Sequence, residues 1–360
     1  MRISPALLCL SVLLGAGCNL LELTPTSEVV RERVAGIQAE PAEIGLGEST
    51  TLTSLLVRPE EQPEELLGQI WFACVETGGE ATGCLGLDLG EAVDDEGGAP
   101  DFTSGDFQFG IGDSFTYTAE GDAVEEAWAA LEPEDRVEGL TVFVAVTWVP
   151  RDNDALQQLL VDLGTAYVQE DEVAIASLSE EFTGLLQDER AETAARRVVI
   201  SDKSAGAPEA IECPVETLLP NANPSLVGVR LHQDEDGKDE GHVLGPVTFV
   251  EPGERLTLRP VLGEGSVEDY LFIDRNGVTE CRREDPFFAW IASGGAAPGS
   301  DYTFTAEEGD LEEVAGRAKV NRFALPEAED FPEDGLSLWV VARDRRGGLV
   351  WLERRFLPLL

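Results

Sequence analysis

The sequence predicts a mainly β protein made of two antiparallel β-sandwiches in tandem, the first carrying an inserted α-helical hairpin. The segment from Phe115 to Glu126 returns as Tyr302 to Glu313, with six of twelve positions identical. Further matches lie on both sides of this repeat in the same order. Most of the segments between them are short and rich in turn residues, which is typical of antiparallel β-structure. We therefore interpret the 360 residues as one domain type used twice.

The composition indicates folded and strongly acidic domains. Hydrophobic residues make up 43% of the chain, and the formal net charge is -45. Proteins bind nucleic acid mainly through cations that displace counterions from phosphates, so we expect no nucleic-acid partner. The acidic surface favours solubility, and salt screens its self-repulsion. An acidic face that selects a cationic partner stays open as an alternative.

The first residues have the pattern of an export signal. A basic residue precedes an apolar run from Ala6 to Leu14, and small residues follow up to Cys18. This resembles a bacterial lipoprotein signal, which implies that residues 1–17 are removed and that Cys18 is acylated, for example with palmitate, as a membrane anchor. Gly15 stands where that family prefers leucine, so release as a secreted protein is the alternative. By the same resemblance, Asn19 implies sorting to the cell outer membrane.

The matches on either side of the repeat set the expected domain boundaries. We expect a tether at 18–33, a first domain at 34–202 with a helical insertion at 152–190, a linker at 203–224 and a second domain at 225–360.

Individual strands are matched in the same way. Val34 to Ile37 is echoed by Leu226 to Val229, and Trp71 to Gly79 by Phe287 to Gly295. The second match predicts that Cys74 occupies the same core position as Trp290. A Gly-rich acidic loop is expected at 80–112 in the first copy. In the second copy, an Asn-Gly pair between two strand-like segments predicts a β-hairpin within 269–285.

The insertion in the first domain has helical periodicity. Its apolar residues recur at helical spacing in two runs: Leu156, Leu159, Leu160, Leu163 and Tyr167, then Ile175, Leu178, Phe182, Leu185 and Leu186. We expect these stripes to pack on each other and on the flank of the sandwich. The alternative is that the helix pair forms the site for a partner.

Four cysteines remain after the signal: Cys74, Cys84, Cys213 and Cys281. An even number of cysteines in an exported protein predicts two disulfides. We favour Cys74 with Cys84 and Cys213 with Cys281, and the other pairings stay open. The spacings are not those of a zinc knuckle.

Asp234, Asp236 and Asp239 form the best candidate for a metal site. Carboxylates around a glycine can supply the oxygen ligands that calcium prefers. The segment is too short for an EF-hand and contains Lys238, so we favour an exposed acidic hairpin tip. Calcium stays open as a cofactor, and no other cofactor is expected.

No residue pattern predicts catalysis. His232 and His242 are the only histidines, and neither lies near a G-x-S-x-G sequence. No pair stands out among the 70 acidic residues. We therefore expect no enzyme and no catalytic residues.

Five arginines make the C-terminal part locally cationic: Arg343, Arg345, Arg346, Arg354 and Arg355. We expect them to pair with neighbouring carboxylates, or to orient the second domain against the first. The six tryptophans mostly lie in strand patterns, which favours core packing.

The strand pattern resembles that of tandem immunoglobulin-like or PKD-like domains in bacterial surface lipoproteins. The segments Asn223 to Gly228 and Asp344 to Trp351 contribute to the resemblance, which covers nearly all of residues 34–360. It implies two immunoglobulin-like sandwiches in a non-catalytic, lipid-anchored cell-envelope protein. Such a protein would act as a binding or structural module through its loops, with an unknown protein or polysaccharide as partner. A secreted carbohydrate-binding protein using exposed aromatics such as Trp128, or calcium-dependent adhesion, is the alternative.

Overall fold

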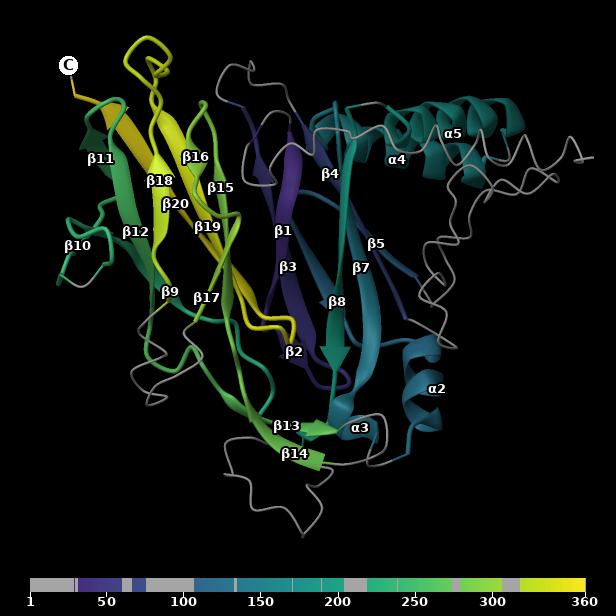
Figure 1. Ribbon diagram of the computed structural model, residues 1–360. Helices are drawn as coiled ribbons and strands as arrows, with labels where there is room; N and C mark the ends of the chain where they lie inside the picture. Colours follow the sequence, from purple (N-terminus) through teal and green to yellow (C-terminus); the bar gives the residue numbers. More distant parts are fainter. Residues whose placement is uncertain are drawn as a thin grey trace, which may run out of the picture.

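The computed structural model describes residues 29, 32–59, 67–75, 107–132, 135–169, 171–188, 190–203, 219–237, 239–273, 279–305 and 318–359. Two β-sandwiches lie next to each other in this part of the chain, and a pair of helices extends from the first (Figure 1). The predicted fold class, a mainly β protein of two tandem antiparallel β-sandwiches with a helical hairpin in the first, is confirmed.

The first sandwich has eight described strands: β1 (Arg33–Glu40), β2 (Glu43–Ile44), β3 (Ser49–Val57), β4 (Gly68–Val75), β5 (Phe107–Ile111), β6 (Ser114–Thr118), β7 (Leu140–Val149) and β8 (Glu192–Ile200). One sheet has the order β1-β3-β6 and the other the order β2-β8-β7-β4-β5. β2 runs parallel to β8, and the other pairs are antiparallel. Because side chains alternate between faces, Leu52, Trp71 and Val144 point into the core and are fully buried.

The second sandwich contains β9 (Leu226–His232), β10 (His242–Val243), β11 (Val247–Val250), β12 (Arg255–Leu262), β15 (Phe287–Ala292), β16 (Ala297–Pro298), β17 (Tyr302–Phe304), β18 (Asn321–Ala324), β19 (Leu336–Arg343) and β20 (Leu349–Pro358). Its sheets have the orders β10-β9-β12-β18-β16 and β11-β20-β19-β15-β17. The predicted hairpin is present as β13 (Asp269–Ile273) and β14 (Thr279–Arg283), and its Asn-Gly turn lies outside the described residues.

The two sandwiches share one strand order. β1-β3-β6 corresponds to β9-β12-β18, and β2-β8-β7-β4-β5 corresponds to β11-β20-β19-β15-β17. The parallel pair recurs as β11 with β20. The register agrees as well, since Ala39 pairs with Leu52 in the first copy and Leu231 pairs with Leu258 in the second. The predicted match between the opening strands is therefore confirmed.

The repeat of Phe115 to Glu126 in Tyr302 to Glu313, in contrast, joins strands that are not equivalent. β6, which begins the first segment, pairs with β3, whereas β17 pairs with β15 in the opposite sheet. The counterpart of β6 is β18, in which Phe323 takes the place of the buried Tyr117. Alternating aromatic and threonine residues suit many half-buried strands, so this match reflects shared composition rather than a shared position.

The predicted match of Cys74 with Trp290 is wrong by one residue. β7 and β19 are equivalent strands of the two sandwiches. Trp71 pairs with Val146, the seventh residue of β7, and Phe288 pairs with Ala342, the seventh residue of β19. Trp71 therefore corresponds to Phe288. A shift of one residue exchanges the two faces of a strand, which is why Cys74 is only half-buried while Trp290 is fully buried.

Helices occur only between strands of the first sandwich in the part of the chain that the structure describes. α2 (Asp122–Ala130) and α3 (Asp135–Glu138), which the sequence did not predict, connect β6 to β7. α4 (Asn153–Val168) and α5 (Glu172–Leu186) form the predicted hairpin between β7 and β8. In this described part, none of the helices combines the length and apolar character needed to cross a bilayer.

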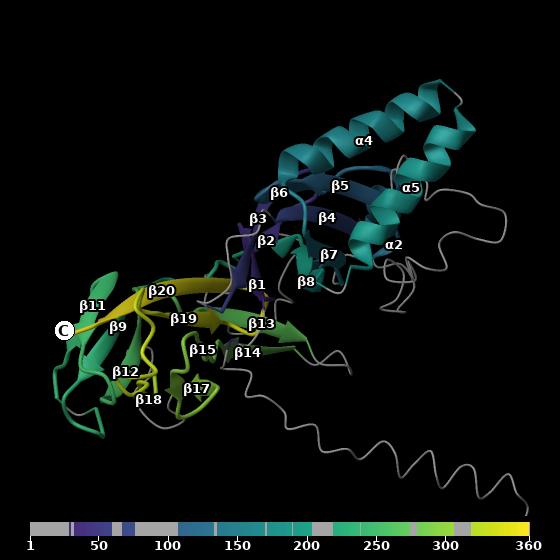
Figure 2. The ribbon, with the colours of Figure 1, turned by 90° about the horizontal axis from the view of Figure 1, so that it is seen from above.

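The hairpin packs on the flank of the first sandwich, on the side away from the second (Figure 2). Leu156 and Phe182, one from each helix, are buried in a cluster with Ile70 and Val149 of the sheet. This confirms the expectation that the apolar stripes pack on each other and on the sandwich.

Candidate binding site at the domain junction

An apolar cluster joins the two sandwiches. Val57 at the end of β3 is fully buried against Ile291 and Trp339, which lie on the outer face of the second sandwich. Val29 belongs to the same cluster, and its backbone NH donates to the Ala292 carbonyl at 2.9 Å. Val29 falls in the predicted tether, so the described end of that segment is docked on the second sandwich.

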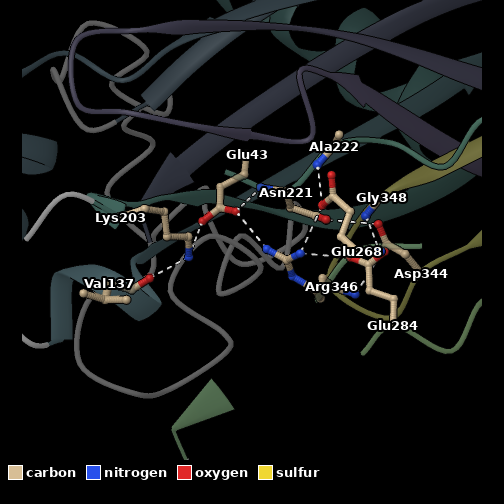
Figure 3. Close-up of polar contacts among 10 residues, drawn as sticks. All are labelled: Glu43, Val137, Lys203, Asn221, Ala222, Glu268, Glu284, Asp344, Arg346 and Gly348. Atoms are coloured by element: carbon tan, nitrogen blue, oxygen red, sulfur yellow. Dashed lines mark hydrogen bonds and ion pairs between the residues drawn. The ribbon is translucent and has the colours of Figure 1, made fainter. Parts of the chain in front are cut away.

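Arg346 is the centre of a buried charge cluster beside these apolar contacts (Figure 3). Its Nη1 lies 2.9 Å from a Glu284 oxygen and 3.2 Å from a Glu268 oxygen. Its Nη2 lies 3.6 Å from a carboxylate oxygen of Glu43, which belongs to the first sandwich. Tyr270 in β13 stacks on the guanidinium at 4.8 Å. The side chain of Arg346 is only 13% exposed, so these ion pairs lie largely out of water.

The buried Glu43 has a second cation as its partner. Lys203 Nζ lies 2.7 Å from Glu43 and donates to the Val137 carbonyl at 2.6 Å, and the backbone NH of Asn221 also donates to Glu43. Asn221 in turn donates through Nδ2 to Asp344 at 3.0 Å. Glu43 of the first sandwich therefore contacts the segment between the domains, through Lys203 and Asn221, and the turn after β19, through Arg346.

Asp344 fixes that turn. Its Oδ1 accepts hydrogen bonds from the backbone NH groups of Arg346 and Gly348, both at 2.8 Å. Gly348 is required there, because a Cβ at this position would lie 1.8 Å from an Asp344 oxygen. The turn therefore presents Arg346 to the first sandwich in a fixed orientation.

The charge cluster contains more acids than bases. Four buried or half-buried carboxylates, those of Glu43, Glu268, Glu284 and Asp344, face Arg346 and Lys203. Burial, with the charges of Asp344 and Glu268, raises the pKa of Glu284 to about 7. Burial also raises the pKa of Glu268.

Asn223 makes a second bridge between the sandwiches. Its Nδ2 donates to the Ala39 carbonyl at 2.6 Å and to Glu40 at 2.7 Å, both in β1. Its Oδ1 accepts from the Leu349 backbone NH at 2.9 Å, at the start of β20. Apolar, ionic and hydrogen-bond contacts together join the two sandwiches into one body.

A pocket of about 620 Å³ lies in this junction. β1 and β8 of the first sandwich form one side, and Phe287 with the β19–β20 turn forms the other. Arg196 of β8 crosses the junction, since it donates to the carbonyls of Ile37 and Gly347. Arg343 crosses it in the other direction and donates to the Ala35 carbonyl at 3.0 Å. Of the two roles expected for the C-terminal arginines, Arg346 pairs with carboxylates and also contacts the first sandwich, whereas Arg343 contacts a carbonyl oxygen of the first sandwich.

The cysteines are described only in part. Cys74 and Cys281 are each disulfide-bonded, while Cys84 and Cys213 lie outside the described residues. The pairing therefore stays a prediction. Cys18, the predicted lipidation site, also lies outside the described residues.

The three aspartates of the predicted metal site are arranged as a turn. Asp239 accepts hydrogen bonds from the Gln233 backbone NH at 3.1 Å and from His232 Nδ1 at 2.8 Å, and these bonds lower its pKa to about 2. Asp234 accepts from the Asp236 backbone NH at 3.0 Å. In the described part of the chain, no group of three or more His, Cys, Asp or Glu residues could hold a metal ion.

The aromatic residues follow the core expectation. Trp128, the tryptophan singled out as a surface residue for carbohydrate, is 9% exposed and packs in the core of the first sandwich. Among the described residues, the exposed aromatic side chains are instead Phe249 of β11 and Tyr302 and Phe304 of β17, and the last two lie beside Phe287.

No family model matches the chain, and no curated protein matches it. Among solved structures, the chain is similar to the three N-terminal domains of the bacteriophage RB49 Highly Immunogenic Outer Capsid protein (Hoc), with 9% identity, a TM-score of 0.18 and coverage of 91% of this chain and 59% of that chain. It is also similar to the two tandem V-type regions of VCBP3, a v-region-containing chitin binding protein, with 9% identity, a TM-score of 0.26 and coverage of 89% and 98%. A third match is Astrotactin-2, with 11% identity, a TM-score of 0.19 and coverage of 94% and 65%. The chain thus spans less than two thirds of the Hoc and Astrotactin-2 chains.

Proposed function

We propose that this chain is a lipid-anchored protein of the bacterial cell envelope that acts, without catalysis, as a binding or structural module. The observation that carries the proposal is the junction, which holds two sandwiches as one body from which the α4–α5 hairpin projects (Figure 2). A body with fixed geometry presents its loops to a partner at little entropic cost.

The anchor and the docked Val29 together limit where this body can lie. A fully extended chain from Cys18 to Val29 spans at most about 40 Å. An acylated Cys18 would therefore keep the junction within about that distance of the bilayer surface. The proposed location is the outer membrane, with a secreted protein as the alternative.

The anchor is tested by Cys18→Ala. We expect this variant to leave the membrane fraction and to lose incorporation of a labelled fatty acid. Cys9→Ala, which changes a cysteine within the predicted signal, is the matched control and should stay in the membrane fraction. If the Cys18→Ala protein still sediments with membranes, the lipid anchor is refuted.

We propose the end of the hairpin as the recognition element. Val168 and Val173 are 86% and 81% exposed, whereas the base of the hairpin is buried on the sheet. Exposed apolar side chains at the end of a projecting element are typical of interaction sites. The hairpin is also an insertion that the second sandwich lacks, since β19 and β20 are joined by a short turn.

Replacing both valines with serine tests this role. We expect the Val168→Ser, Val173→Ser variant to lose most of the in-cell crosslinks that the parent protein forms, with its thermal stability unchanged. The control is Val227→Ser with Val247→Ser, two valines that are 57% and 50% exposed on the second sandwich. Equal crosslinking of both variants and the parent would rule out the hairpin end. Deleting residues 152–190 is less informative, because it uncovers the apolar face around Ile70.

A further inference from the structure

The pocket in the junction has an unusual charge for this protein. Five arginines line it: Arg196, Arg197, Arg343, Arg345 and Arg346. Among the described residues, no Asp or Glu lines it, although these two types account for 70 of the 360 residues of the chain. The lining therefore differs in sign from the net charge of the chain, which is -45.

The arginines of the pocket differ in their partners. Arg346 is neutralised by Glu43, Glu268 and Glu284, and Arg345 pairs with Asp285 at 3.0 Å.

Arg196 and Arg343 differ from these two arginines because they donate to carbonyl oxygens. Among the described residues, neither has a carboxylate within ion-pair distance. The Nε of Arg343 is buried without a hydrogen-bond partner. One arginine from each sandwich therefore brings to the pocket a guanidinium group that forms no ion pair with a carboxylate of the described residues.

The two guanidinium groups are close enough to repel each other. Burial lowers the pKa of Arg196 to about 10; Asp344 opposes this effect and the charge of Arg343 adds to it. Burial likewise lowers the pKa of Arg343. Arginine side chains stay protonated in proteins at neutral pH, so an anion between the two guanidinium groups would relieve this repulsion.

We propose that the junction pocket binds a small organic carboxylate, with its carboxylate between Arg196 and Arg343 and its apolar body against Phe287 and Val34. Guanidinium groups bind carboxylates through paired, charge-assisted hydrogen bonds. The volume of about 620 Å³ is that of a small-molecule site. This site is independent of the hairpin and of the lipid anchor.

The surroundings decide between ligand classes. An acidic polymer would extend beyond the pocket over the acidic surface of the protein. Salt does not screen the repulsion between charges that lie within about 8 Å of each other. Inorganic phosphate would fit the arginines but leave the apolar wall formed by Val34 and Phe287 without contact. A compact carboxylate with an apolar body would contact both the arginines and the apolar wall. Since its partners come from both sandwiches, binding should also strengthen the junction.

The test is a titration of the full mature chain with 4-fluorobenzoate, followed by fluorine NMR. We expect saturable binding with a Kd on the order of 1 mM or tighter. Arg343→Gln and Arg196→Gln should each weaken binding by about tenfold or more, which corresponds to one lost charge-assisted hydrogen bond. The matched control is Arg322→Gln, since Arg322 is exposed and pairs with Glu235 outside the pocket; it should bind like the parent.

Two further measurements keep the test decisive if an arginine variant folds poorly. Ala195→Phe narrows the pocket from an exposed position without removing a charge, and it should weaken binding by a similar factor. The neutral analogue 4-fluorobenzyl alcohol should show no saturable binding. The proposal is overturned if Arg343→Gln and Ala195→Phe both bind like the parent, if the alcohol binds as well as the acid, or if inorganic phosphate binds more tightly than 4-fluorobenzoate.

Discussion

Replacing Arg346 with glutamine is expected to lower the free energy of unfolding by about 3 to 5 kcal/mol near pH 8. The substitution leaves Glu43, Glu268 and Glu284 facing one another with Lys203 as the one remaining cation of the cluster. Burying carboxylates without a counter-charge costs far more than the loss of an exposed ion pair. Urea unfolding monitored by tryptophan fluorescence measures the effect, with separate transitions fitted if the two sandwiches do not unfold together.

The control for this prediction is Arg322→Gln, which breaks the exposed pair with Glu235. It should cost less than about 1 kcal/mol. The penalty of Arg346→Gln should also shrink near pH 5, because Glu284 and Glu268, whose pKa values are raised, then need less counter-charge. A loss no larger than that of the control would mean that Arg346 does not hold the junction.

The parts of the fold that the sequence predicted correctly have local, periodic signals. Leu156 and Leu159 lie on one face of a helix whatever the rest of the chain does, and both are buried as expected. The match of Val34 to Ile37 with Leu226 to Val229 also agrees with the strand pairing.

The strand errors come from features that are not local. The sequence predicts a Gly-rich loop where β5 lies. Gly110 is a residue of this strand, and a glycine is needed there because a Cβ would meet the Phe115 ring at 2.6 Å. The repeated aromatic and threonine pattern fits β6 and β17 equally well, although they lie in different sheets. Composition alone cannot tell which sheet a short strand joins.

Of the residues that form the junction, only the arginines have a recognisable signal in the sequence. The arginines after β19 stand out in an acidic chain, and orientation of the second domain was one of their two expected roles. Glu43, Glu268 and Glu284 have no comparable signal, because they are three of 70 acidic residues and meet Arg346 only after both sandwiches have folded. The pocket is equally invisible in the sequence, since Arg196 and Arg343 lie in different domains.

Glu284→Gln is expected to remove a pH-dependent cost from the folded state. The pKa of Glu284 is raised from 4.5 to about 7 on folding, so its contribution to stability is fully present below about pH 4.5 and is lost as the pH rises through 7. That shift corresponds to about 3 kcal/mol between these limits. Glutamine does not titrate, so the free energy of unfolding of the variant should lack the part of the decline with rising pH that Glu284 causes.

The quantity to measure is the difference in unfolding free energy between variant and parent, taken from urea unfolding at several pH values between about 4 and 8. Glutamine retains only one acceptor for Arg346 and the Glu268 backbone NH, so the difference has an offset at every pH. The change of this free-energy difference with pH reports the ionisation of the Glu284 carboxyl group. The difference should shift by about 3 kcal/mol in favour of the variant as the pH rises. Glu280→Gln, at an exposed carboxylate paired with Arg282, should change by less than about 1 kcal/mol. If the two differences run parallel across this range, Glu284 ionises as freely in the folded protein as in the unfolded chain, and the acid excess at the junction carries no cost.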